Sequence, residues 1–161
     1  MLKVIEMFGG IGAFRKALIN LKVPFEVVDY IEIDKKACEA YNLLYEPKEI
    51  TKDITNYSFN NIDILWHSSP CQDFSSANTY GNASKMTKSI LYQEVLRILQ
   101  EGLKPKVIIW ENVETLLSKN NSIYKEQYCY ILNKLGYVNK TIISNGLEGG
   151  GTTKQKKSFY N

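Results

Sequence analysis

Short apolar segments alternate with longer amphipathic ones along the chain. The short segments have the dense apolar character of buried strands and occupy residues 2–8, 25–31, 62–66, 107–110 and about 137–143. In the longer segments, apolar residues recur three and four positions apart, which predicts helices over 13–21, 35–44, 90–100 and 122–135. Strands that alternate with helices predict an α/β fold, with a doubly wound and mostly parallel sheet covered by helices on both faces.

The same pattern predicts a single domain over residues 1–145, because neither a repeat nor an interdomain linker interrupts it. Residues 146–161 are rich in glycine and lysine and predict an irregular segment where the domain is cut short. Hydrophobic residues make up 44% and charged residues 23% of the 161 positions, which is ordinary for a globular domain.

Composition excludes several classes of protein. No window approaches the roughly 18 consecutive apolar residues of a membrane span, and the N-terminus lacks the layout of a secretory signal peptide. The three cysteines lie far apart without a CxxC pair, so we expect neither a metal site nor a disulfide framework, and a cytoplasmic location. A net charge of +3 permits a nucleic-acid partner without arguing for one.

A glycine-rich turn, Phe8-Gly9-Gly10-Ile11-Gly12, separates the first predicted strand from the first predicted helix. Glycines there let a ligand approach the backbone, and the start of a helix offers free N–H groups. In an open α/β sheet this is the usual crevice for a nucleotide-like ligand. The GxGxxG dinucleotide fingerprint is not met, because Arg15 stands at the third glycine, and an ordinary tight turn is an equally good interpretation of the segment alone.

Carboxylates follow the next two apolar segments. Glu32 ends the second strand about twenty residues after the turn, where an acid commonly reaches the ribose hydroxyls of a nucleoside. Asp53, followed by Ile54, ends a third short segment and could accept a hydrogen bond from an adenine amino group. Asp29 and Asp34 are instead interpreted as surface or helix-capping residues.

One cysteine stands where packing does not explain it. Cys71 follows a buried strand and opens a polar loop, whereas Cys38 and Cys129 fall within predicted helices and are interpreted as small core residues. A thiolate at such a position can act as a nucleophile. Glu111 directly follows the strand at 107–110 and could supply a proton beside it, although an acid at a helix start is an equally good interpretation.

Together these segments resemble the DNA cytosine-5 methyltransferase family. The FGGIG turn is similar to its FxGxG cofactor loop, Pro70-Cys71-Gln72 to its PCQ motif, and Glu111-Asn112-Val113 to its ENV motif, in the same order. Leu91-Tyr92 corresponds to the pair that follows the family's catalytic loop. The resemblance covers roughly Val4 to Ile143.

The resemblance implies a Rossmann-like, S-adenosylmethionine-dependent methyltransferase fold. Members of the family transfer a methyl group from this cofactor to carbon 5 of cytosine in double-stranded DNA, after flipping the base out of the helix. Cofactor-binding residues would be Phe8, Gly10, Gly12, Glu32, Ile33, Asp53 and Ile54. Catalytic residues would be Pro70, Cys71, Glu111 and Asn112, and substrate-binding residues Gln72, Ser75 and Lys157.

In this scheme Cys71 attacks carbon 6 of cytosine, and Glu111 binds the ring nitrogen and the amino group. The loop from Gln72 to about Lys88 closes over the flipped base. His67, the one histidine, has no role in the family and is interpreted as structural.

The sequence departs from the family at three places. Ile33 stands where an aromatic residue is common, which weakens stacking on adenine. Lys157 stands where the family's Gln-x-Arg-x-Arg strand has its first arginine, and lysine is no substitute at a bidentate site. A target-recognition domain is not seen, so the fold is expected to be incomplete and to need a complementary subunit for restriction–modification-type DNA methylation.

Two other interpretations stay open. The chain could be a non-catalytic remnant that binds S-adenosylmethionine without turnover, or a truncated methyltransferase fragment. A nucleotide-dependent oxidoreductase is disfavoured, because the third glycine is missing and the PCQ and ENV segments would have no role. The many Lys, Asn, Ile and Tyr residues indicate an AT-rich genome, of a bacterium or a phage.

Overall fold

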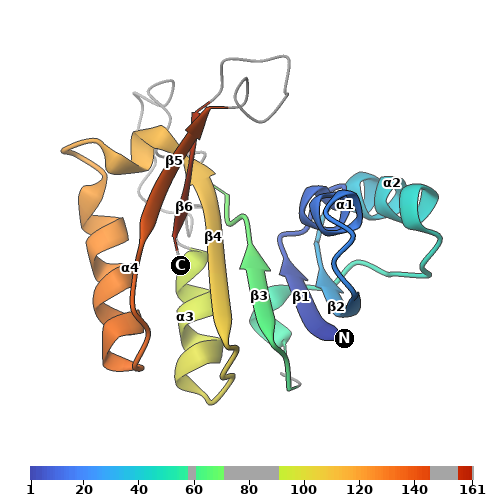
Figure 1. Ribbon diagram of the computed structural model, residues 1–161, viewed down its shortest axis with the longest axis horizontal. Helices are drawn as coiled ribbons and strands as arrows, with labels where there is room; N and C mark the ends of the chain where they lie inside the picture. The colour runs from blue at the N-terminus through green and yellow to red at the C-terminus, as the bar shows by residue number, and fades with distance from the viewer. Residues whose placement is uncertain (58–60, 71–90, 146–155, 161) are drawn as a thin grey trace. The chain divides into compact units, whose positions relative to one another are not determined.

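The computed structural model describes residues 1–57, 61–70, 91–145 and 156–160 (Figure 1). The chain forms two compact units. The first unit comprises Met1–Ser68 with Glu101–Ile109, and the second comprises Ser69–Gln100 with Trp110–Asn161. Strand β4, Val107–Val113, contributes its first part to the first unit and its remainder to the second.

The first unit is a parallel sheet with two helices. Its strands are β1 (Leu2–Met7), β2 (Phe25–Ile31), β3 (Ile64–His67) and the start of β4, in the order β2-β1-β3-β4. Helix α1 (Ala13–Asn20) follows β1, and α2 (Lys35–Tyr45) follows β2; a short 3-10 helix, η1, covers Ile54–Asn56. These bounds confirm the predicted alternation of strands and helices.

Strand β1 lies between β2 and β3 and pairs in parallel with both (Figure 1). Its residues Val4, Ile5, Glu6 and Met7 are all fully buried, as expected of a strand covered on both faces. Met7 pairs with both Ile31 and His67, so the carboxyl ends of the three strands are level. The chain leaves β1 toward β2 on one side and returns to β3 on the other, which makes this end of β1 the topological switch point where α/β sheets bind ligands.

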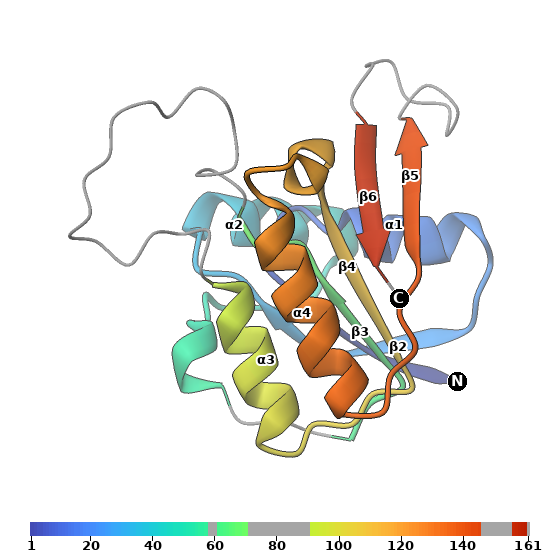
Figure 2. The same ribbon diagram turned by 90° about the vertical axis from the view of Figure 1, so that its left-hand side faces the viewer.

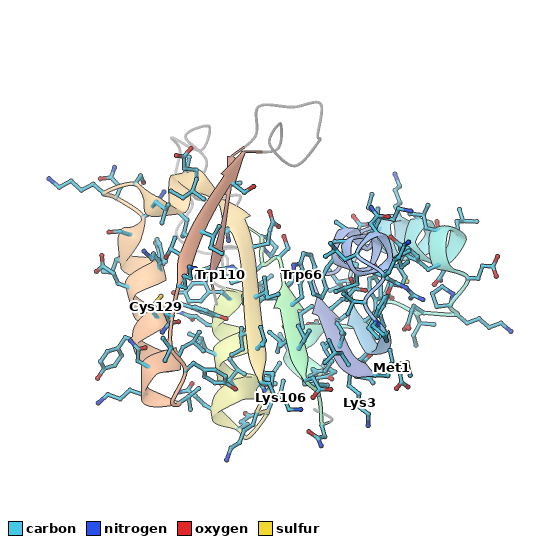
Figure 3. The ribbon with its side chains drawn as sticks, in the orientation of Figure 1. Met1, Lys3, Trp66, Lys106, Trp110 and Cys129 are labelled. Atoms are coloured by element: carbon cyan, nitrogen blue, oxygen red, sulfur yellow. The ribbon has the colours of Figure 1, made fainter. Side chains whose placement is uncertain are left out.

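The amino ends of the strands in the first unit are joined by Asp63. Its carboxylate accepts a hydrogen bond from the backbone N–H of Lys3 at 2.9 Å and forms an ion pair with Lys106 at 2.7 Å. Figure 3 shows Lys3 and Lys106 at the amino ends of β1 and β4. These contacts secure the edge of the sheet opposite the switch point.

Three tyrosines form the core between α2 and the sheet of the first unit. Tyr30 stacks on Tyr41 with a centroid separation of 4.0 Å, and Tyr41 meets Tyr45 edge-on at 5.0 Å. We call Tyr30, Tyr41 and Tyr45 the tyrosine cluster. Cys38 packs there too and is buried, which confirms its interpretation as a core residue.

The second unit is built on the remainder of β4. Helix α3 (Tyr92–Gln100) precedes the strand, and η3 (Glu114–Leu117), α4 (Ser122–Lys134), β5 (Thr141–Asn145) and β6 (Lys156–Tyr160) follow it. Strand β6 pairs antiparallel with both β4 and β5, in the order β4-β6-β5. Helices α3 and α4 lie side by side (Figure 2).

An aromatic cluster holds the second unit together. Trp110 on β4 lies 4.3 Å from Tyr128 on α4 and 5.5 Å from Tyr92 on α3, measured between ring centroids. All three rings are almost fully buried, and close aromatic pairs contribute about 0.5–1.5 kcal/mol beyond the area they bury. Figure 3 labels Trp110 on the strand and Cys129 on α4. Cys129 is half-buried, so its predicted place in the core is only partly correct.

Two sequence-based expectations are wrong. Residues 156–160 form β6 rather than part of an irregular segment over 146–161, because their backbone pairs with strands on both sides. Glu111, Asn112 and Val113 lie within β4 rather than after it, because β6 extends the ladder along these three residues. The same pairing rules out the interpretation of Glu111 as an acid at a helix start.

Among the residues that the structure describes, no helix is long and apolar enough to cross a membrane. No group of three metal-ligating side chains occurs within the same residues.

We predict that His67 stays uncharged in the folded protein well below neutral pH. The side chain is fully buried at the end of β3, and burial lowers the pKa of its imidazole from 6.5 to about 3. Because His67 is the single histidine, its ring signals in a proton NMR spectrum should not shift between pH 8 and pH 5 in native protein. In urea they should titrate near the ordinary value, about 6.5.

The lower pKa of His67 in the folded protein makes the free energy of unfolding depend on pH. Between about pH 6.5 and pH 3 the unfolded chain binds a proton on this ring that the folded protein does not bind, so the contribution of His67 to the free energy of unfolding falls by about 1.4 kcal/mol for each unit by which the pH decreases. A native ring that titrates near pH 6.5 would contradict the prediction.

We predict that Gly12→Ala destabilises the protein more than Gly136→Ala. Both glycines have left-handed backbones, with φ of 83° and 93°, which cost an alanine about 1–2 kcal/mol. A Cβ at Gly12 would also lie 2.5 Å from the ring of Tyr45, whereas no described atom lies within 4 Å of a Cβ at Gly136. Urea unfolding followed by circular dichroism should show about 1–3 kcal/mol of additional loss for Gly12→Ala. Equal losses would mean that the tyrosine cluster moves aside at little cost.

Candidate cofactor and catalytic site

The turn after β1 has a conformation that few residues adopt. Phe8, Gly10 and Gly12 have φ angles of 53°, 54° and 83°, all in the left-handed region. For a phenylalanine this conformation costs about 1–2 kcal/mol, and such strain persists where the surroundings enforce it, commonly at functional sites. Ser68 donates its backbone N–H to the carbonyl of Met7 at 3.2 Å, so the end of β3 lies beside this turn.

The glycines of the turn face different surroundings. A Cβ at Gly9 would lie 2.6 Å from the ring of Tyr30, and one at Gly12 would touch the rings of Tyr41 and Tyr45. At Gly10 no atom of the described residues lies within 4 Å of an added Cβ. Gly10 is therefore the position of the turn that a ligand can approach closely, and Gly9 and Gly12 are needed for packing.

Glu32 lies next to the turn, as the sequence predicts. It follows β2, and its carboxylate accepts hydrogen bonds from the backbone N–H groups of Gly10 at 3.0 Å and Asp34 at 2.9 Å. A carboxylate has about four lone-pair sites, so Glu32 keeps acceptor capacity for a hydroxyl of a ligand. The structure thus brings together the glycine turn and the carboxylate, which are far apart in the sequence.

The predicted adenine-binding residues lie on segments connected to Glu32. Ile33 is its neighbour and is 68% exposed. Lys52 donates its backbone N–H to the carbonyl of Glu32 at 2.8 Å, which holds the segment of Asp53 and Ile54 beside the end of β2. Asp53 caps η1 by accepting from the backbone N–H of Thr55 at 2.9 Å, and Ile54 is buried.

The other two acids of this region have structural partners. Asp34 accepts hydrogen bonds from the backbone N–H groups of Lys36 and Ala37 at the start of α2, which confirms its interpretation as a helix cap. Asp29 is half-buried and forms an ion pair with Lys52, so it is not a solvated surface residue.

Sequence analysis missed a buried carboxylate on β1, Glu6, which binds the start of α1 beside the turn. Glu6 is fully buried on β1 and accepts hydrogen bonds from the backbone N–H of Arg15 at 3.0 Å and the hydroxyl of Tyr41 at 2.6 Å. Burial raises the pKa of its carboxyl group. Gly12, at the N-cap of α1, has no side chain to bind these amides, so Glu6 takes that role from the sheet. The signal in the sequence was a glutamate within an apolar strand.

In the second unit, Ser69 connects the segment before Cys71 to β4. Its hydroxyl accepts a hydrogen bond from Nε1 of Trp110 at 3.0 Å, and its carbonyl accepts one from Nδ2 of Asn112 at 3.4 Å. Ser69 and Asn112 are buried, and Pro70 is half-buried. Cys71, Gln72 and Ser75 lie outside the described residues.

Glu111 is buried within β4, with 9% of its surface exposed, beside Asn112. On the neighbouring strand, the backbone of Lys157 pairs with Val113 and that of Phe159 pairs with Glu111. The predicted catalytic acid and the predicted lysine are therefore on adjacent strands of the second unit.

Comparison with known proteins agrees with these motifs. The family described as C-5 cytosine-specific DNA methylase matches residues 2–156. The type II methyltransferase M.HhaI of Haemophilus parahaemolyticus is 32% identical over 161 residues, which cover 98% of this chain and 48% of that protein. M.BanI of Aneurinibacillus aneurinilyticus is 34% identical over 142 residues, which cover 84% of this chain and 32% of that protein.

Solved structures show the same fold. The Dnmt2 methyltransferase of S. pombe matches with a TM-score of 0.83 at 24% identity, over 99% of this chain and 50% of that one. A DNA modification methyltransferase described as encoded within an E. coli prophage matches with a TM-score of 0.78. The expected Rossmann-like methyltransferase fold is thus confirmed, and the chain spans about half or less of the length of these proteins. It belongs to the C-5 cytosine-specific DNA methylase family.

Proposed function

We propose that this chain is the cofactor-binding and catalytic part of a DNA (cytosine-5-)-methyltransferase. The reaction is the transfer of a methyl group from S-adenosylmethionine to carbon 5 of cytosine in double-stranded DNA. The observation that carries the proposal is the hydrogen bond from Gly10 to Glu32, at a left-handed turn whose Gly10 face is open. Membership of the family supports it.

The first unit fits the cofactor. The open face at Gly10 allows close approach of the ligand to the turn formed by Phe8, Gly10 and Gly12. Glu32 has acceptor capacity for the ribose hydroxyls. The exposed Ile33 offers an apolar contact to the adenine, and Asp53 and Ile54 would complete its site. The cofactor would supply a methyl group that is activated by a positively charged sulfur.

The second unit would supply the chemistry at cytosine. Carbon 5 is a poor nucleophile until another group adds at carbon 6, and the thiolate of Cys71 would form that bond. Glu111, buried and adjacent to Asn112, would hold a proton at the ring nitrogen and accept from the amino group. After carbon 5 takes the methyl group and loses its proton, the bond between sulfur and carbon 6 breaks.

The contacts of Ser69 support this placement. Because Cys71 follows Ser69 by two residues, and Ser69 is bound to Trp110 and Asn112, we expect the thiolate to act beside Glu111. Pro70 would shape the pocket between them. Gln72, Ser75 and Lys157 would contact the DNA and the flipped base.

DNA recognition is part of the proposal. M.HhaI and M.BanI are about two to three times as long as the region that they share with this chain, and both come from bacteria. We propose that selection of a DNA sequence depends on protein beyond these residues, supplied by a complementary subunit, and that the enzyme acts in the cytoplasm of a bacterial cell.

We predict that Gly10→Ala weakens cofactor binding while preserving the fold. The added Cβ would occupy the open face of the turn, so titration calorimetry with S-adenosylmethionine should show at least about tenfold weaker binding. Gly136→Ala is the matched control, because it has the same type of backbone strain far along the chain and should bind normally. Normal binding by Gly10→Ala would place the cofactor elsewhere.

We predict that the chain forms a covalent adduct through Cys71 with duplex DNA that contains 5-fluorocytosine, in the presence of S-adenosylmethionine. Fluorine at carbon 5 cannot leave as the proton does, so the bond between sulfur and carbon 6 persists. Denaturing gels and mass spectrometry should detect the adduct, which Cys71→Ser should abolish and Cys129→Ser should retain.

Detection of the adduct also distinguishes an active methyltransferase from a non-catalytic remnant. Cofactor binding without an adduct, even when a complementary subunit is added, would favour a non-catalytic protein that binds S-adenosylmethionine. Loss of the adduct in Cys129→Ser would contradict the assignment of Cys71 as the nucleophile.

A further inference from the structure

Two tyrosine hydroxyls bind the carbonyl groups of the glycine turn. Tyr30, on β2, donates its hydroxyl to the carbonyl of Gly10 at 2.6 Å. Tyr45, on α2, donates its hydroxyl to the carbonyl of Gly12 at 2.7 Å. The two donors come from different elements, 20 and 33 residues along the chain from the groups that they bind.

Several other backbone groups of the turn also have partners. Gly9 donates its N–H to the carbonyl of Ile31 and accepts from the N–H of Gly12, while Gly10 donates to Glu32. The carbonyl of Gly12 accepts from the N–H of Lys16 at 3.0 Å, at the start of α1, as well as from Tyr45. Buried backbone groups must be paired, and side chains from β2 and α2 add to the backbone bonds that fix the conformation of the turn.

The tyrosine rings lie on one side of the turn. An added Cβ at Gly9 would collide with the ring of Tyr30, and one at Gly12 would collide with the rings of Tyr45 and Tyr41. At Gly10, by contrast, no atom of the described residues lies within 4 Å of an added Cβ. The rings thus close one face of the turn and leave the other face to a ligand.

The tyrosine cluster is itself held in place. The hydroxyl of Tyr41 donates to Glu6 and accepts from the guanidinium of Arg15 at 3.0 Å. The same guanidinium lies 4.7 Å from the centroid of the Tyr45 ring, a cation–π contact. Stacking of Tyr41 on Tyr30 completes the cluster, so neither Tyr30 nor Tyr45 can rotate without disturbing its neighbours.

Both hydroxyls keep their protons over the physiological pH range. Burial raises the pKa of Tyr30 and that of Tyr45 above the ordinary value of 10.0. They are therefore permanent donors to the turn.

We propose that Tyr30 and Tyr45 are positioning residues of the cofactor site, whose hydroxyls hold the glycine turn in the one conformation that accepts S-adenosylmethionine. The inference rests on the proposed function and deepens it, because it assigns a role to residues outside the glycine and carboxylate motifs. Neither tyrosine touches the reacting atoms in this scheme.

A positioning role predicts an effect on binding that exceeds the effect on stability. If the turn samples other conformations, the apparent dissociation constant rises in inverse proportion to the fraction of molecules that are competent to bind. Replacement by phenylalanine keeps the ring, and with it the packing, and removes only the hydrogen bond. Loss of a hydrogen bond of ordinary strength corresponds to about fivefold weaker binding.

The test compares Tyr30→Phe, Tyr45→Phe and the double variant with the unchanged chain. Titration calorimetry at 25 °C measures the dissociation constant for S-adenosylmethionine, and thermal melting without ligand measures stability. Tyr92→Phe is the matched control, because it removes a hydroxyl of a buried tyrosine that donates to Gln127 at 2.8 Å in the second unit. Circular dichroism at 25 °C establishes that each variant is folded.

We expect each single variant to bind about fivefold more weakly and the double variant to bind more weakly than either single variant. Tyr92→Phe should bind as the unchanged chain does, although its melting temperature falls by a similar amount. Two outcomes overturn the inference alone: binding within twofold of the unchanged chain in both single variants, or equal weakening in Tyr92→Phe. Absence of binding by the unchanged chain overturns the proposed function, and this inference with it.

Discussion

The first unit depends on how the polar backbone groups after β1 are satisfied. This strand is buried on both faces and ends at a turn with left-handed residues, where the backbone pairs only part of its own N–H and C=O groups. Side chains from later segments add to these bonds: Glu32 accepts, and Tyr30 and Tyr45 donate. Glu6, on β1 itself, accepts from the backbone N–H of Arg15 in α1. Each group leaves water to do so, and an unmade bond there would cost about 1–3 kcal/mol. The position of α1, the packing of α2 and the open face at Gly10 all follow from this arrangement.

In the second unit, two polar side chains, Glu111 and Asn112, are buried on strand β4. Asn112 binds the carbonyl of Ser69 and its own neighbour Val113, while Trp110 binds the hydroxyl of Ser69. The rings of Tyr92 and Tyr128 pack against Trp110 on this part of β4. The segment that leads to Cys71 thus starts from a fixed point. If Cys71 acts as proposed, its placement gains precision from the contacts that hold the residues before it.

The two units divide the proposed work between them. The first holds a glycine turn and a carboxylate suited to a nucleoside, and the second holds the buried Glu111 and Asn112. Strand β4 contributes residues to both units. Ligand sites in α/β proteins commonly use the carboxyl ends of strands in this manner, because loops there are free to vary while the sheet stays constant.

Local pattern alone determined the alternation of strands and helices, the glycine turn after β1 and the order of the motifs that identify the family. Apolar periodicity and glycine placement act over a few residues, so they can be read from the sequence. Glu6 was overlooked because an acid in an apolar segment has no local partner. The tyrosine cluster was overlooked because its hydrogen bonds join residues 20 to 35 positions apart. Strand β6 and the extension of β4 through Glu111 to Val113 were mispredicted for the same reason. Pairing between strands that are distant in the sequence supplies most of their stability, and only the tertiary structure decides it.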